Sequence, residues 1–109
     1  DRLGQLFEQF VGLELIRQSR VARHETRVLF WRDPDGPEVD WVVERRGELR
    51  PVEVKWTDAP DRRDARHLET FLGEYPEARR GFIVCQTPRP VRISERVTAL
   101  PWQDLGSVL

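Results

Sequence analysis

The segment from Glu38 to Trp56 constrains the fold most, because it has the pattern of two β-strands that fold back on each other. Each arm alternates apolar and polar residues with the period of two that a half-buried strand requires. Centring the turn on Arg46-Gly47 places Trp41 opposite Val52 and sets the apolar stripes of both arms on one side. The sequence therefore predicts a β-hairpin whose core face carries Val39, Trp41 and Val43 from one arm and Val52, Val54 and Trp56 from the other.

Two carboxylates are predicted to meet on the opposite, non-core face of this hairpin. The same register sets Asp40 directly across from Glu53, and cross-strand partners have Cβ atoms only about 4.5 to 5.5 Å apart. Lys55 points to that face as well, one step along from Glu53. Like charges across a ladder are destabilising, so the pair requires a cation: a divalent metal such as Mg²⁺, or Lys55 or an arginine. The alternative is an exposed sheet face that happens to be charged.

The composition predicts one soluble domain over residues 1–109. The net charge of -1 lacks the basic footprint of an autonomous nucleic-acid binder. No apolar run approaches the roughly 20 residues of a membrane span, no secretory signal is present, and no G-x-x-x-x-G-K-[ST] loop offers an ATP site. We therefore expect a cytoplasmic protein. The chain has no Met and opens inside a helical pattern, so we expect it to be a piece of a longer protein.

A helix is predicted from Leu3 to about Ser19, with an apolar face formed by Leu3, Leu6, Phe7, Phe10 and Leu13. Glu14 falls inside that face by angle, and Glu8 lies at its flank. Most acids at such a flank are merely solvated, and a functional role for Glu8 is the alternative.

The remaining elements complete a mixed α/β order. A strand over 27–32 and a turn over Asp33-Pro34-Asp35-Gly36-Pro37 lead into the hairpin, giving a three-stranded antiparallel meander. A helix follows from about Asp61 to Glu74, and its first turns carry Arg62, Arg63 and Arg66 on the solvent side. The apolar run 81–86, with Cys85 as a buried small hydrophobe, suits a strand parallel to the arm that carries Glu53. Segments 91–93 and 97–100 add a short edge strand, and 101–105 forms a closing helical turn that packs Trp102 on the core.

These residues resemble a known family. A helix, then a meander with Asp40 in EVDW, then Glu53 and Lys55 in PVEVKW, is similar to the PD-(D/E)XK, restriction-endonuclease-like superfamily. The strings GQLFEQFV, LFWRDPDGPEVDWVVE, LRPVEVKW and LPWQDL more closely resemble the domain of unknown function that lies C-terminal to an AAA-type ATPase module in many prokaryotic proteins. The resemblance covers nearly the whole chain. One position departs from the superfamily motif: Val39, not a proline, stands directly before Asp40.

The resemblance implies a metal-dependent nuclease. Asp40, Glu53 and the backbone carbonyl of Val54 would hold Mg²⁺ or Mn²⁺, Glu8 would complete or orient the shell, and Lys55 would position or deprotonate the attacking water. The substrate would be DNA or RNA, and an N-terminal ATPase module of the parent chain would be the partner.

Three functions remain in competition. The first is phosphodiester hydrolysis at Asp40, Glu53 and Lys55, with Arg62 or Arg66 near the phosphates of a bound nucleic acid rather than merely solvated. The second is a non-catalytic module that binds nucleic acid or a partner, or that regulates the ATPase. The third is an oligomerisation role, suggested by the four tryptophans, although two of them, Trp41 and Trp56, belong to the predicted core face.

Overall fold

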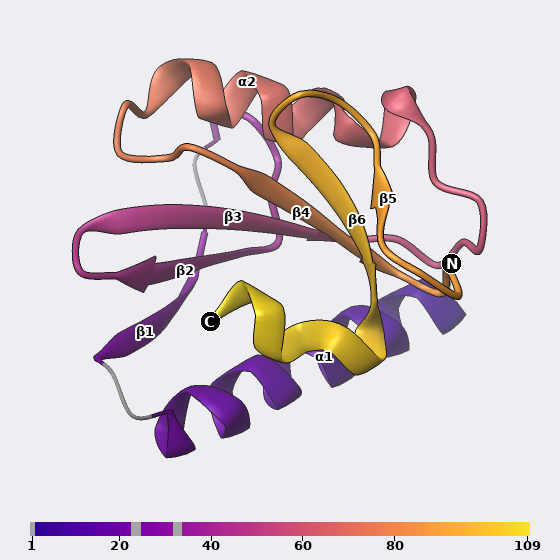
Figure 1. Cartoon of the computed structure of the whole chain (residues 1–109), viewed down its shortest axis with the longest axis horizontal. Coiled ribbons are helices and arrows are strands. Elements are labelled where there is room, and N and C mark those ends of the chain that lie inside the picture. Colours follow the sequence, from indigo (N-terminus) through magenta and orange to yellow (C-terminus); the bar gives the residue numbers. More distant parts are fainter. Residues whose placement is uncertain (1, 23–24, 32–33) are drawn as a thin grey trace.

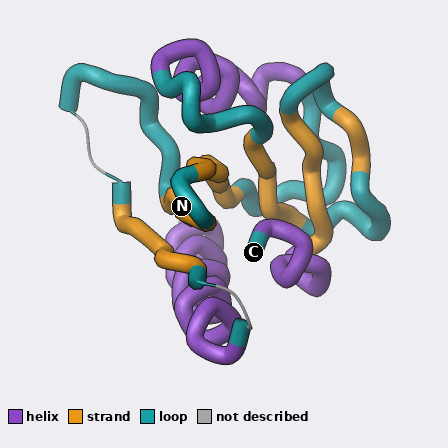
Figure 2. The backbone as a smooth tube through the Cα atoms, turned by 60° about the vertical axis from the view of Figure 1, so that its left-hand side comes forward, coloured by secondary structure: helices purple, strands orange, loops and turns teal. Residues whose placement is uncertain are grey.

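The computed structural model describes residues 2–22, 25–31 and 34–109 of the chain. Helices lie on both sides of a central sheet (Figures 1 and 2). The elements in chain order, with η marking a 3-10 helix, are α1 Arg2–Val21, β1 Thr26–Phe30, β2 Trp41–Arg45, β3 Glu48–Val54, η1 Arg62–Ala65, α2 Arg66–Glu74, β4 Gly81–Cys85, β5 Val91–Arg92, β6 Val97–Pro101 and η2 Trp102–Val108.

The described strands form one open, mixed sheet in the order β1-β2-β3-β4-β6-β5. The first three strands are the antiparallel meander, and β3, β4 and β6 run parallel. The predicted hairpin register is confirmed, because Trp41 pairs with Val52. Both turn residues have positive φ, 52° at Arg46 and 83° at Gly47, as the tightest hairpin turn requires.

The face of the hairpin opposite Trp41 and Val52, predicted to lie outside the core, is covered as well, so the alternative of an exposed sheet face that happens to be charged does not hold. One face of the sheet packs on α2 and the other on α1 and η2 (Figure 1). Val42 and Leu49 indicate in the sequence that the α2 side of the sheet is also buried, because they are apolar and point away from the face of Trp41 and Val52. The chain bends at Asp40, so Val39 joins the α2 side of the core instead of the face of Trp41.

Helix α1 exists as predicted but buries a different face. Its buried residues are Phe7, Val11, Gly12 and Leu15. The predicted apolar residues Leu3, Leu6, Phe10 and Leu13 are instead between 42% and 68% exposed. The reason is a close contact: a Cβ on Gly12 would lie 2.1 Å from the Trp41 ring, so the helix can approach the sheet only along its glycine side.

The second half of the chain follows the prediction with smaller corrections. The helix after the meander starts with a 3-10 turn capped by Asp61, and it buries Leu68, Phe71 and Leu72. Strand β4 is wholly buried and parallel to β3, as expected. The edge strand is β5, whereas β6 lies inside the sheet between β4 and β5.

Two further predictions are settled in part. The first strand ends at Phe30, and Arg32 and Asp33 of the predicted strand and turn lie outside the described residues. Trp56, expected on the core face, follows the end of β3 and is 45% exposed, with its ring edge against Phe7. In the described parts of the chain, no helix is long and apolar enough to cross a membrane.

Candidate active site

The two predicted carboxylates lie beside each other where β2 begins and β3 ends. The backbone N–H of Asp40 donates to the Val52 carbonyl at 3.1 Å, and its Oδ2 accepts from the Val54 N–H at 2.7 Å. The side chain of Asp40 thus continues the ladder where the backbone bends away, and this bond fixes it beside Glu53. Lys55 approaches the same spot, with Nζ 3.8 Å from Glu53 Oε1.

Glu53 is a buried carboxyl with incomplete compensation. Its residue is only 5% exposed, and Oε2 is buried with no hydrogen-bond partner among the residues that the structure describes. Lys55 is too distant for a hydrogen bond, and its side chain is 39% exposed. A buried carboxylate that lacks partners is costly, so this position carries a stored penalty.

The electrostatics of the pair reflect that penalty. The pKa of Glu53 is raised to about 7, chiefly by burial and to a smaller extent by the charges of Asp40, Glu38 and Asp64, against the lowering effect of Lys55. Burial likewise raises the pKa of Asp40 to about 6, opposed by its hydrogen bond from Val54 and supported by the charge of Glu8. Two neighbouring acids that titrate near neutrality are a frequent mark of a functional site.

Three further acids surround the pair from separate elements. Glu8 comes from α1, Glu38 from the segment before β2, and Asp64 from η1, where it accepts a hydrogen bond from the Asp61 N–H at 2.9 Å. Sequence reasoning proposed Glu8 but missed Glu38 and Asp64. The signal for Glu38 was its place two residues before Asp40, while nothing local in the sequence indicated that η1 lies near Glu53.

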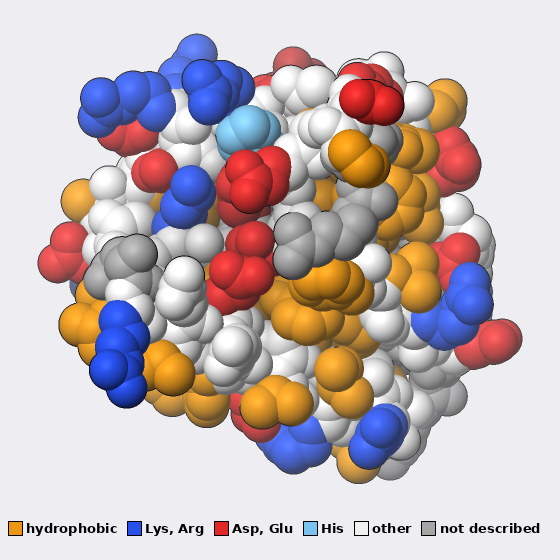
Figure 3. Space-filling view, turned by 180° about the vertical axis from the view of Figure 1, so that it is seen from behind, with side chains coloured by type: hydrophobic (Ala, Val, Ile, Leu, Met, Phe, Trp, Pro, Cys, Tyr) orange, Lys and Arg blue, Asp and Glu red, His pale blue; other side chains and the backbone are white. Residues whose placement is uncertain are grey.

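The predicted nucleic-acid contacts Arg62 and Arg66 are exposed at the start of η1 and α2. Among the described residues neither forms an ion pair with a carboxylate of the site, and Arg66 contacts the ring of His67 at 3.4 Å. Figure 3 shows acidic side chains near the middle of one face of the molecule, with a cluster of basic side chains at the upper left, further basic side chains at the lower left, the bottom and the right, and hydrophobic side chains to the right of and below the acids. The arrangement leaves a mixed surface around the acids.

The residues present fit a hard divalent cation. Within the described ranges no group of three or more acids, histidines or cysteines has metal-site geometry, so the protein offers a carboxylate pair rather than a closed cage. Mg²⁺ is commonly held by one or two carboxylates plus waters and substrate phosphates. The unpartnered Oε2 of Glu53 and the second oxygen of Asp40 are the atoms available to it.

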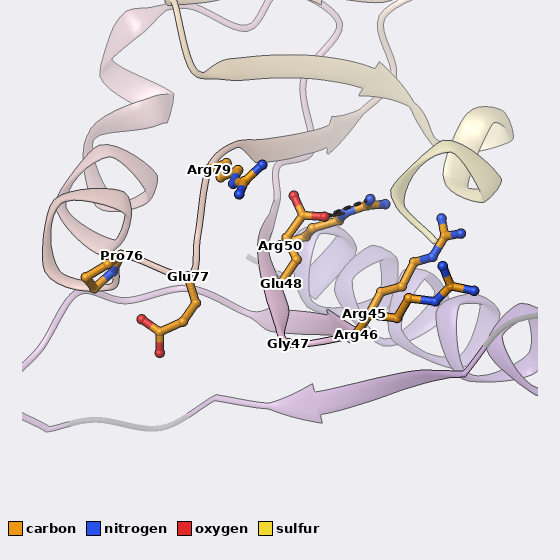
Figure 4. Close-up of a pocket in the computed structure, with 8 residues that line it drawn as sticks. All are labelled: Arg45, Arg46, Gly47, Glu48, Arg50, Pro76, Glu77 and Arg79. Carbon is orange, nitrogen blue, oxygen red and sulfur yellow. Dashed lines mark hydrogen bonds and ion pairs between the residues drawn. The ribbon is translucent and has the colours of Figure 1, made fainter.

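A hollow of about 470 Å³ lies at the turn end of the hairpin, away from Asp40 and Glu53 (Figure 4). It is lined by arginines of the hairpin and of the segment before β4. Arg50 donates to Glu48 and to the backbone carbonyls of Val108 and Leu109. Because its guanidinium is engaged in holding η2 to the sheet, we assign Arg50 a structural role.

The comparisons with known proteins give one match. The family model described as "Domain of unknown function (DUF4143)" matches residues 3–105. No curated protein and no solved structure matches the chain.

Proposed function

We infer that this chain, which belongs to the DUF4143 family, is a metal-dependent nuclease domain that hydrolyses phosphodiester bonds in DNA or RNA. The observation that carries the proposal is the pair Asp40 and Glu53. Glu53 is buried and incompletely compensated, and it lies next to the partly buried Asp40 and to Lys55. A fold that needed only a charged sheet edge would leave both carboxylates in water. The proposed site residues are Asp40, Glu53, Lys55 and Glu8.

The cation we propose is Mg²⁺ or Mn²⁺, held by Asp40 and Glu53. When bound, such an ion supplies charge neutralisation at a phosphoryl group and acidifies a coordinated water. Asp40 is oriented by the Val54 N–H, so one oxygen stays aimed at the site. Glu53 keeps its reacting oxygen in a dry environment, which strengthens its attraction to a cation.

Lys55 is the positively charged side chain that the protein itself contributes to the proposed site, in addition to the metal ion. Its side chain is partly exposed, and Nζ lies 3.8 Å from Glu53 Oε1, so the ammonium group is accessible to solvent beside the carboxylate. A fixed cation near a developing negative charge stabilises the transition state. We therefore propose that Lys55 orients the attacking water and stabilises the phosphate.

The order of elements supports the same proposal. A first helix, an antiparallel meander, a second helix and a parallel strand is the order expected of the restriction-endonuclease-like core that the sequence resembles. The proposal extends to the setting that the resemblance implies, a cytoplasmic domain joined to an AAA-type ATPase module. Arg62 and Arg66 are proposed as outer phosphate contacts.

Metal binding is the first test. Mn²⁺ and Mg²⁺ are titrated calorimetrically into the wild type and into Asp40→Asn and Glu53→Gln, and we expect binding that both substitutions abolish. Glu44→Gln is the matched control, because Glu44 is an acid of the same hairpin that pairs with Arg27. Unchanged binding in either site variant would remove that carboxylate from the site.

Cleavage is the second test. We expect the wild type to cut DNA or RNA with Mn²⁺, and Lys55→Ala to lose cleavage while keeping its fold and its metal affinity. Full activity in Lys55→Ala would contradict the role given to the lysine, and metal binding without cleavage of any nucleic acid would favour a non-catalytic module.

A second candidate function, partner binding, is favoured by the exposed stripe on α1. Leu3, Leu6, Phe10 and Leu13 are 56%, 53%, 42% and 68% exposed, and they recur at the spacing of one helical face. Contiguous exposed apolar patches mark interaction surfaces. In this role the domain would bind a partner or regulate its ATPase. Leu6→Ser with Leu13→Ser should then abolish binding to the ATPase part of the parent chain without lowering metal affinity.

A further inference from the structure

A half-open cavity of about 610 Å³ adjoins the carboxylate pair on the side of α1 and of the segment before β2. Asp40 and Glu8 belong both to the wall of this cavity and to the proposed catalytic site. Glu38, Phe30 and Trp31 also line the cavity. Its volume falls within the range of about 300–1,000 Å³ that is typical of small-molecule sites. The cavity is therefore large enough for one planar ring system next to a phosphate at Asp40.

The aromatic side of the cavity is held firmly. The Phe30 side chain is 56% exposed, and its ring rests edge-on against Trp41 with centroids 5.5 Å apart. The Trp31 ring contacts the rings of Phe71 and Tyr75, each in a T-shaped arrangement with centroids 5.3 Å apart. Rings that are braced in this way lose little conformational freedom when a ligand stacks on them.

All the charged residues that the structure describes in the wall of the cavity are acidic. Glu8, Glu38 and Asp40 line it, and none of its described lining residues is a lysine or arginine. A phosphate is therefore unsuited to the cavity itself. A nucleobase suits it better, because every base has a face that stacks on an aromatic ring, and a carboxylate accepts a hydrogen bond from an exocyclic amino group such as that of cytosine.

We propose that this cavity receives one unpaired nucleobase with an exocyclic amino group, from the nucleic acid whose phosphate lies at Asp40 and Glu53. The inference rests on the proposed function and gives it a substrate class. A base inside a duplex must leave its stack to reach the cavity, which has an energetic cost. Single-stranded or unpaired segments are therefore the preferred substrates.

Binding of short oligonucleotides that carry 2-aminopurine tests the proposal without cleavage. The Lys55→Ala variant is used with Mn²⁺, and the single strand is compared with its duplex. We expect fluorescence quenching and at least tenfold tighter binding of the single strand. Phe30→Ala should weaken single-strand binding by about tenfold, the effect of removing one stacking partner, and Phe30→Tyr should restore it.

Two further variants sharpen the test. Phe10→Ala is the matched control, since Phe10 is a similarly exposed phenylalanine on α1 that does not line the cavity, and it should bind like the parent variant. Glu38→Gln should reduce the preference for oligo-dC over oligo-dT, because thymine offers no amino group.

The outcomes separate the two proposals. If the base stacks in the cavity but the wild type cuts no nucleic acid, the proposal of a nucleobase cavity stands and the proposal of nuclease activity is overturned. Equal binding of single strand and duplex, no binding, or no effect of Phe30→Ala would overturn the cavity assignment, even in a wild type that cuts. Displacement of the oligonucleotide by spermidine at equimolar concentration would show an amine site instead and would also overturn it.

Discussion

Strand β3 buries a charged side chain on each of its faces, and the two are treated in opposite ways. Arg50 is 6% exposed and Glu53 is 5% exposed. They lie three residues apart, about 10 Å along the strand. Arg50 faces η2, whereas Glu53 faces the side covered by η1 and α2. The same strand therefore provides an internal comparison of two buried charges.

The arginine is satisfied by its surroundings. Its Nε and Nη2 donate to Glu48 at 3.2 and 3.0 Å, and its Nη1 donates to the carbonyls of Val108 and Leu109 at 2.8 and 3.2 Å. Glu53 has only Lys55, at 3.8 Å, and one oxygen without a partner in the described part of the chain. Burial alone therefore does not mark a site: a buried charge with complete partners stabilises the fold, whereas one without them, like Glu53, is a candidate for ligand binding.

Removing the satisfied charge should have the largest effect. We expect Arg50→Ala to lower the free energy of unfolding by about 3–5 kcal/mol. Among the described residues, the Val108 carbonyl loses its side-chain donor, the Leu109 carbonyl keeps only Arg45 at 3.4 Å, and Glu48 keeps only Arg80 at 3.9 Å. Urea unfolding at neutral pH measures the loss of stability. Arg27→Ala removes an exposed partner of Glu44 and should cost less than about 1 kcal/mol. Equal losses in the two variants would end the distinction between the structural arginine and a surface ion pair.

The carboxyls of Asp40 and Glu53 should make the stability of the protein depend on pH. The pKa of Asp40 and of Glu53 is raised in the folded state, to about 6 and about 7, so between about pH 4 and 7 the folded state holds protons that the unfolded state has released. Their contribution to stability is therefore complete below pH 4 and is lost as the pH rises to 7, by at most about 3 kcal/mol for each carboxyl.

Glu53→Gln is the matched variant for this pH dependence. Without the titrating group, its unfolding free energy measured by urea at pH 4.5 and at pH 8 should differ less than that of the wild type. At pH 8 it should also be the more stable protein, since a neutral amide replaces a buried carboxylate. A wild type whose stability rises over this interval would contradict the assignment of the raised pKa values.

The contact between α1 and the sheet should affect both the stability of the protein and the proposed metal site. Gly12→Ala places a Cβ against the Trp41 ring, 2.1 Å away if nothing moves, so α1 must shift, and we expect a loss of about 1–3 kcal/mol. The shift also displaces Glu8 from Asp40. Thermal unfolding and metal titration measure the two effects. Gly73→Ala in α2, where nothing lies within 4 Å, should be neutral or stabilising.

The turn at the arginine end should give the smallest effect. Arg46 adopts a φ of 52°, which costs a residue with a side chain about 1 kcal/mol. Asn tolerates this conformation, so Arg46→Asn should stabilise the protein by up to about 1 kcal/mol in urea unfolding. Gly47→Ala, at a φ of 83°, should act in the opposite direction. A stabilising Gly47→Ala would show that this turn is not strained.

Local patterns were reliable wherever neighbouring residues decide the outcome. The alternation in the hairpin and the Arg46-Gly47 turn fixed the pairing of Trp41 with Val52, and this register carried Asp40 to Glu53. The apolar run of β4 and the periodic face of α2 were equally direct, because each buries what its own pattern indicates.

The residue pattern alone was enough to predict the hairpin, its register and hence the meeting of Asp40, Glu53 and Lys55, since a slip of one residue would exchange core and charged positions. The buried side of α1, by contrast, depends on packing between elements, because apolar residues lie nearly all round that helix and the approach of Trp41 to Gly12 selects one side. The tertiary structure also decided that Glu8, Glu38 and Asp64 surround the pair and that Glu53 is buried. Those features depend on contacts between elements that are distant in the chain, and no local periodicity encodes them.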